Sequence, residues 1–95
     1  MTAADEKTRT IKVRDHEFIV NDDYAESYAA FKIVRKLGAK DVDAFEKLDC
    51  SFKLIEGATG CDEAAIVEMA GGENAPAKSV MQFAAEIIEA IDKKN

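Results

Sequence analysis

Few residues in this sequence have side chains that could do chemistry, and the first is a lone histidine. His16 is the only histidine in the chain, and it lies between acidic neighbours in a predicted turn. A general base or a zinc site needs convergent partners, and one histidine without a close cysteine pair cannot assemble the common zinc arrangements. We therefore interpret His16 as an exposed turn residue.

The two cysteines, Cys50 and Cys61, lack the Cys-x-x-Cys spacing of zinc and redox sites. The polar N-terminus has no hydrophobic segment for secretion, which favours a reducing compartment. Isolated cysteines in such a compartment are mostly free. We expect both to be reduced thiols with a structural role.

A run of acidic residues around Asp43 could suggest calcium binding. An EF-hand loop that begins at Asp41 would need glycine at its sixth position and glutamate at its twelfth, where this sequence has Glu46 and Phe52. Acidic residues are instead favourable at the first turn of a helix. The pattern predicts that Asp41 and Asp43 cap a helix.

Glycines are concentrated at residues 57–60 and 71–72, but neither segment has the Gly-Lys-Ser/Thr ending of a phosphate-binding loop. We interpret both segments as turns between helices. The sequence thus predicts no enzyme, no metal site and no cofactor. Binding to another protein is the remaining interpretation.

The composition of the chain disfavours nucleic acids and membranes as binding partners. The 95 residues carry a net charge of −6, which repels phosphate backbones. The sequence has one basic cluster, formed by Lys32, Arg35, Lys36 and Lys40. It lacks the interleaved aromatic residues that stack on bases, so we predict that it is solvated or paired with acidic residues and does not bind nucleic acid. No apolar run approaches the roughly 20 residues that span a bilayer, so we expect a cytosolic protein that does not bind membranes.

The N-terminal third predicts a β-hairpin. Residues 1–8 show no periodicity and are expected to be disordered, whereas residues 9–95 are expected to form one domain. Apolar residues then alternate on either side of a polar break near Asp15 and His16. The hairpin would bury its apolar face against helices, because an isolated hairpin is marginal in water.

The remainder predicts helices. Apolar residues recur every three or four positions from Tyr24 to Leu37, after a capping box at Asp23 and Glu26 and before Gly38. A second stripe runs from Val42 to Ile55 and is expected to end at Gly57. The short connection of residues 38–40 predicts that these two helices form an antiparallel pair.

Residues 59–70 are expected to contain a short helix, and a final amphipathic helix follows the break at residues 71–76. The predicted fold is α+β and mostly helical, with a short N-terminal β-hairpin packed on a three- or four-helix bundle. If Phe31 or Phe52 were exposed, its stripe would be an interface instead of core. The predicted core comprises Val13, Phe18, Phe31, Val34, Phe45, Leu48, Phe52, Phe83 and Ile87.

The order of these elements resembles that of the small tail assembly chaperones of long-tailed phages and prophages, over residues 9–95. The resemblance is carried by hydrophobic patterns and turn positions: the hairpin around residues 10–18, the helix that ends at residues 52–57, the break that contains Pro76, and the final helix around residues 83–90. The family has no invariant chemical signature. The weakly apolar residues 59–70 depart from its pattern.

The resemblance implies a protein of the host cytoplasm that binds the tape measure protein, escorts it during tail tube polymerisation, and is absent from the mature virion. Contact with the major tail tube protein and a homo-oligomer remain open. The alternative is a small cytoplasmic interaction or regulatory adaptor unrelated to phages. The family commonly makes a longer form by ribosomal frameshifting, and residues 93–95, Lys-Lys-Asn, can be encoded by a slippery adenine-rich run.

We place the expected protein-binding surface on the final helix. Its apolar residues cover more of the circumference than one core face needs, so part of them would be free for the tape measure or for another copy. The predicted protein-binding residues are Val80, Met81, Ile87, Ile88 and Ile91.

Overall fold

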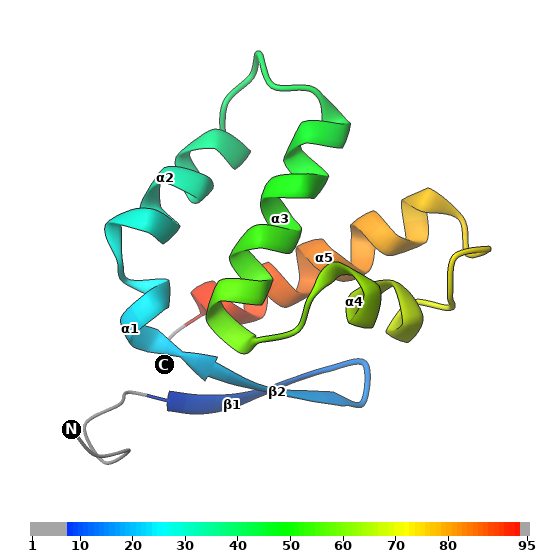
Figure 1. Ribbon diagram of the computed structural model, residues 1–95, viewed down its shortest axis with the longest axis horizontal. Helices are drawn as coiled ribbons and strands as arrows, with labels where there is room; N and C mark the ends of the chain where they lie inside the picture. The colour runs from blue at the N-terminus through cyan, green and yellow to red at the C-terminus, as the bar shows by residue number, and fades with distance from the viewer. Residues whose placement is uncertain (1–7, 94–95) are drawn as a thin grey trace.

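The computed structural model describes residues 8–93, and it combines a β-hairpin with helices (Figure 1). The predicted α+β fold is confirmed. Disorder was expected for residues 1–8: residues 1–7 lie outside the described part, whereas Thr8 is the first residue of a strand. Within residues 8–93 the elements are β1 (Thr8–Val13), β2 (His16–Asn21), α1 (Asp22–Ala25), α2 (Tyr28–Leu37), α3 (Ala44–Thr59), α4 (Glu63–Met69) and α5 (Ala77–Asp92).

The hairpin pairs β1 with β2 in antiparallel register, with Ile11 opposite Phe18. Its two turn residues, Arg14 and Asp15, both have positive φ, as a tight two-residue hairpin turn requires. The alternation predicted from sequence holds, because one face is buried and the other is exposed. The buried face consists of Ile11, Val13, Phe18 and Val20.

Helices α3 and α5 cover this apolar face. β2 packs on α3, β1 packs on α5, and α3 and α5 pack on each other. α4 contributes Ile66, which is fully buried although the segment looked weakly apolar in the sequence. The core therefore lies between the hairpin, α3, α4 and α5 (Figure 1), and Phe18, Phe52, Phe83 and Ile87 belong to it as predicted.

The predicted first helix is in fact two helices. Asn21 caps α1 by accepting from the amides of Asp23 and Tyr24, and Ser27 caps a new helix by accepting from Ala30. The expected capping box at Asp23 and Glu26 is therefore wrong. Gly38 ends α2 as predicted.

The bounds of α3 also differ from the prediction. Asp43, not Asp41, is its N-cap and accepts from the Glu46 amide at 2.8 Å. The helix continues past Gly57 and ends at Gly60, whose φ of 80° is the left-handed conformation that glycine adopts easily. α2 and α3 run in opposite directions side by side (Figure 1), as expected for an antiparallel pair.

Arg9 ties the two ends of the described chain together. Its guanidinium pairs with the Asp22 carboxylate, with Nε 2.9 Å from Oδ1, and donates to the carbonyl oxygens of Ala90 and Ile91 at the end of α5. A cation at a helix C-terminus is favourable because the free carbonyls there carry partial negative charge. Lys93 is the C-cap residue of α5, and Lys94 lies outside the described residues.

Candidate protein-binding site

α2 has two apolar faces, and only one of them packs against the protein. Ala30 is buried and Ile33 and Leu37 are half-buried, so this face makes the contact with the rest of the fold. Tyr28, Phe31 and Val34 lie on the other side and are 67%, 54% and 50% exposed. We call these three residues the α2 face. The prediction that Phe31 and Val34 are core residues was therefore wrong.

The α2 face is ordered by contacts among its own side chains. The rings of Tyr28 and Phe31 stack with their centroids 6.2 Å apart. The Lys32 ammonium lies 5.5 Å from the centre of the Tyr28 ring, and the Arg35 guanidinium lies 5.8 Å from that of Phe31. Aromatic residues are thus interleaved with the basic cluster, contrary to the sequence-based interpretation. Cation–π contacts of this kind are worth about 0.5–1 kcal/mol at exposed sites.

Phe45, at the first turn of α3, is 78% exposed, so its predicted place in the core was also wrong. It adjoins Glu46, whose carboxylate pairs with Lys36 of α2 at 2.8 Å. The hydrogen bond from Lys36 to Glu46 raises the pKa of Lys36. The start of α3 is thereby held close to the end of α2, with Phe45 facing solvent.

A groove of about 490 Å³ lies between α2, α3 and α5, and we call it the α2–α5 groove. Val34 of the α2 face is one of its lining residues, so the α2 face continues into it. Its walls are mostly apolar side chains, with Glu89 and Asp92 as the charged exceptions. The apolar lining residues include Val34, Leu37, Leu54, Ile88 and Ile91.

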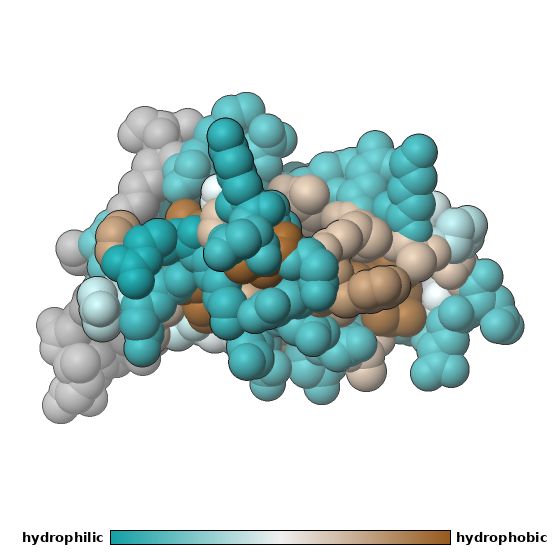
Figure 2. Space-filling model, turned by 90° about the horizontal axis from the view of Figure 1, so that it is seen from above, coloured by the Kyte–Doolittle hydropathy of each residue, from teal (hydrophilic) through white to brown (hydrophobic). Residues whose placement is uncertain are grey.

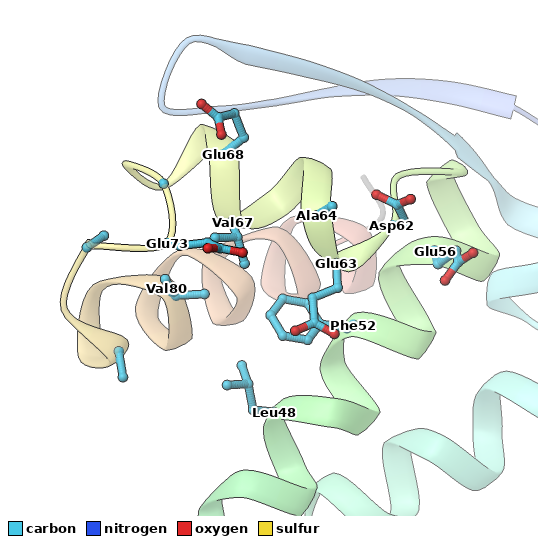
Figure 3. Close-up of a pocket in the computed structure, with 13 residues that line it drawn as sticks. Leu48, Phe52, Glu56, Asp62, Glu63, Ala64, Val67, Glu68, Glu73 and Val80 are labelled. Carbon is cyan, nitrogen blue, oxygen red and sulfur yellow. The ribbon is translucent and has the colours of Figure 1, made fainter.

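A second groove of about 980 Å³ lies between α3, α4 and the start of α5 (Figure 3). Leu48, Phe52, Val67 and Val80 provide its apolar lining. Figure 2 shows exposed apolar residues bordered by hydrophilic ones on the right side of the molecule, where α4 and the start of α5 lie in Figure 1. The charged residues that line this groove are all acidic: Glu56, Asp62, Glu63, Glu68 and Glu73.

The structure divides the five predicted binding residues of α5 among different environments. Ile88 and Ile91 line the α2–α5 groove, and Val80 lines the acidic groove. Met81 is half-buried and lines neither groove. Ile87 is fully buried in the core, so a partner cannot reach it in this conformation. Val80 and Ile91 are also buried, at 8% and 5% exposure, so only Met81 and Ile88 of the five are half-buried. Protein binding by α5 stays a prediction.

The residues considered for chemistry are not brought together. His16 is half-buried, contrary to the prediction of an exposed turn residue, and its ring packs edge-to-face with that of Phe83, with the centroids 5.8 Å apart. Cys50 and Cys61 are both free thiols. Within residues 8–93 no three histidine, cysteine or acidic side chains are arranged to hold a metal ion.

The helices in the described part of the chain are also too short or too polar to cross a membrane. Comparison with protein-family models, with curated proteins and with solved structures gave no significant match. The candidate site is therefore defined by geometry alone: an exposed α2 face that continues into the α2–α5 groove.

Proposed function

We propose that this chain is a small protein-binding chaperone that holds an apolar helical segment of its partner against the α2 face. The main observation that supports this proposal is that Tyr28, Phe31 and Val34 are exposed on a helix whose other face already packs into the fold. In the sequence these residues have the spacing of a buried helix face, yet in the structure they do not pack into the core. Contiguous exposed apolar residues of this kind mark interaction sites.

The α2–α5 groove supports a helical partner in particular. A partner helix can place one row of apolar side chains on the α2 face and a neighbouring row between Val34 and Ile88. Such recognition needs anchors at intervals of three and four residues in the partner. It needs no catalytic or metal chemistry from the chaperone.

The resemblance to small tail assembly chaperones supplies the partner for this proposal, which is the tape measure protein of a phage or prophage. This chain would bind its helical, apolar stretches in the host cytoplasm until tail tube subunits polymerise around it, and would be absent from the mature virion. Contact with the major tail tube protein would follow at the moment of handover. A longer frameshifted form would carry the same domain.

Co-purification with the tape measure protein encoded in the same gene cluster tests the proposal. Wild-type chain should retain the tape measure, and the variant Phe31→Glu should lose it at least about tenfold, since a carboxylate cannot be buried in an apolar contact. Ile19→Glu is the matched control, because Ile19 is 64% exposed on the hairpin and lies outside the α2 face. Equal loss in both variants, or none in either, contradicts the proposed site.

The genetic context separates the chaperone from an unrelated adaptor. A major tail protein gene upstream and a tape measure gene downstream support the chaperone. An adenine run over codons 93–95 with an overlapping frame one nucleotide back supports the frameshifted form. AAG codons at 93 and 94 without such a frame remove that support.

Single-stranded nucleic acid is the alternative ligand to test for the α2 face, because Tyr28 and Phe31 lie beside Lys32 and Arg35. The net charge of −6 disfavours it. Fluorescence anisotropy with a labelled single strand at low salt is expected to show no binding.

A further inference from the structure

The apolar surface formed by the α2 face and the α2–α5 groove is bordered by opposite charges on its two sides. On α2, Lys32 and Arg35 are exposed and lie against the aromatic rings of the α2 face. On α5, Glu89 and Asp92 are exposed and line the groove. We call the first pair the basic edge and the second pair the acidic edge.

The spacing of residues along both helices places each edge next to an apolar contact residue. Arg35 comes four residues after Phe31, so the two side chains are neighbours on one side of α2. Asp92 comes four residues after Ile88, and both line the groove. A helix that contacts Phe31 and Ile88 therefore meets basic groups along one flank and carboxylates along the other.

The charges of the two edges are not paired within the described chain. The four ion pairs in residues 8–93 involve neither edge. Lys36, the next basic residue of α2, differs from the basic edge because it pairs with Glu46 at 2.8 Å. A complementary ligand must therefore carry opposite charges on its two flanks.

We propose that the two edges select and orient the client helix, an inference that rests on the proposed function. The client carries acidic side chains on one flank of its apolar row, against Lys32 and Arg35. It carries basic side chains on the other flank, against Glu89 and Asp92. Turning a helix end to end exchanges its two flanks, so only one direction matches both edges. The chain therefore holds its client in a fixed direction.

The edges supply a discrimination that apolar contact lacks. The exposed side chains of the α2 face accept any helix with a matching apolar row. A helix with carboxylates on both flanks meets like charge at the acidic edge, and a helix with basic residues on both flanks meets it at the basic edge. Repulsion of this kind is how interfaces reject unsuitable partners.

Two fluorescent helical peptides of about 18 residues, which span about 27 Å, test the selection. Both contain leucine at intervals of three and four, with equal numbers of glutamates and lysines. In the segregated peptide the glutamates lie on one flank and the lysines on the other, whereas in the mixed peptide each flank carries both. Fluorescence anisotropy is expected to show at least about fivefold tighter binding of the segregated peptide. This preference should shrink as sodium chloride increases, because exposed charge pairs are individually weak and are screened by salt.

The outcomes separate this inference from the proposed function. Equal affinity for the two peptides, with both lost in Phe31→Glu, would overturn selection by the edges and leave the α2 face standing. Failure of both peptides to bind would overturn the inference, whether a small apolar molecule or another copy of the chain occupies the groove instead. The proposed function is decided separately, by retention of the tape measure protein in the wild type and its loss in Phe31→Glu.

Inversion of both edges tests the direction. The variant Lys32→Glu/Arg35→Glu/Glu89→Lys/Asp92→Lys keeps the net charge of −6, because it exchanges two positive charges for two negative ones. The segregated peptide then carries a paramagnetic label at its N-terminus. Amide signals are expected to broaden at the first turn of α2 in one protein and at its last turn in the other. Broadening at the same end in both proteins would overturn orientation by the edges.

Circular dichroism equal to that of the wild type shows that the inverted variant is folded. A milder variant, Glu89→Gln/Asp92→Asn, removes only the acidic edge. It is expected to bind the segregated peptide at least about threefold more weakly and the mixed peptide unchanged, since the mixed flank gains and loses equally. Glu68→Gln/Glu73→Gln is the control, because it removes the same charge at two exposed positions in the other groove. Loss in this control equal to that of the milder variant would overturn the assignment to the acidic edge.

Discussion

The ring of Tyr24 occupies the space where Gly57 lacks a side chain. A Cβ atom built at Gly57 would lie 2.2 Å from Cζ of Tyr24 and 2.6 Å from its hydroxyl oxygen. Gly57 sits inside α3, where glycine costs about 1 kcal/mol relative to alanine, and the gap it leaves allows α1 to pack closely on α3. Gly57 therefore is a packing residue, although the sequence suggested a helix end.

Gly57→Ala is expected to destabilise the fold by about 1–3 kcal/mol, because Tyr24 must move out of its packed position against the core. In the background Tyr24→Ala the same change should stabilise by up to about 1 kcal/mol through helix propensity. Urea denaturation of the four proteins measures both effects. Gly38→Ala is the control and should be nearly neutral, because an added Cβ there meets nothing closer than 3.8 Å. If Gly57→Ala changes the stability in the same direction with and without the Tyr24 ring, the packing argument is contradicted.

Arg9→Met is expected to cost about 1.5–3 kcal/mol of stability, since hydrogen bonds to charged groups are of that size and the Asp22 carboxylate would lose its partner. The comparison is Lys12→Met. The Lys12 ammonium is mostly exposed and lies 4.0 Å from an exposed Asp15, so its loss should cost less than about 0.5 kcal/mol. Equal thermal unfolding of the two variants would refute a structural role for Arg9.

Asp15→Gly is expected to stabilise the hairpin by about 0.5–1 kcal/mol. Asp15 has a φ of 69°, which glycine adopts without the steric cost that other residues bear, and the ion pair lost with Lys12 is weak. Arg14 is left unchanged because its guanidinium pairs with Glu86 of α5 at 2.7 Å. Urea midpoints measure the gain, and a lower midpoint would contradict it.

The pair between Arg14 and Glu86 predicts a pH dependence. The hydrogen bond from Arg14 lowers the pKa of Glu86 below its ordinary value. A carboxyl group whose pKa is lower in the folded state stabilises the fold above its unfolded pKa, and this stability is lost as the pH falls through the folded pKa. Arg14→Met should raise the pKa of Glu86 toward its ordinary value in an NMR titration, while Lys12→Met should leave it unchanged.

Much of the fold could be predicted because local patterns agree with it. The alternation around Ile11 and Phe18 predicted the hairpin, and the spacing of Phe83 and Ile87 predicted the buried face of α5. The break before α2 was missed because the stripe from Tyr24 to Phe31 keeps a helical period across it. Ser27 is the signal that could have revealed the break, as an N-cap type within the stripe.

The candidate site could not be predicted, because α2 is apolar on two faces. Ala30 and Leu37 look no more suited to the core than Phe31 and Val34 do. Which face packs is decided by the tertiary contact with α3, and periodicity does not report it. The same reason explains the error at Phe45, where the stripe of α3 extends beyond the part of the helix that reaches the core.

The central claim is that the α2 face receives a partner protein, and NMR of the isotope-labelled chain during titration with a helical tape measure fragment tests it most directly. We predict that amide signals of residues 28–37 shift or broaden, with those of Ile88 and Ile91 at the groove, while those of the outer hairpin face around Ile19 stay in place. Shifts confined to the hairpin, or signals unchanged at a saturating concentration of the fragment, would contradict the account.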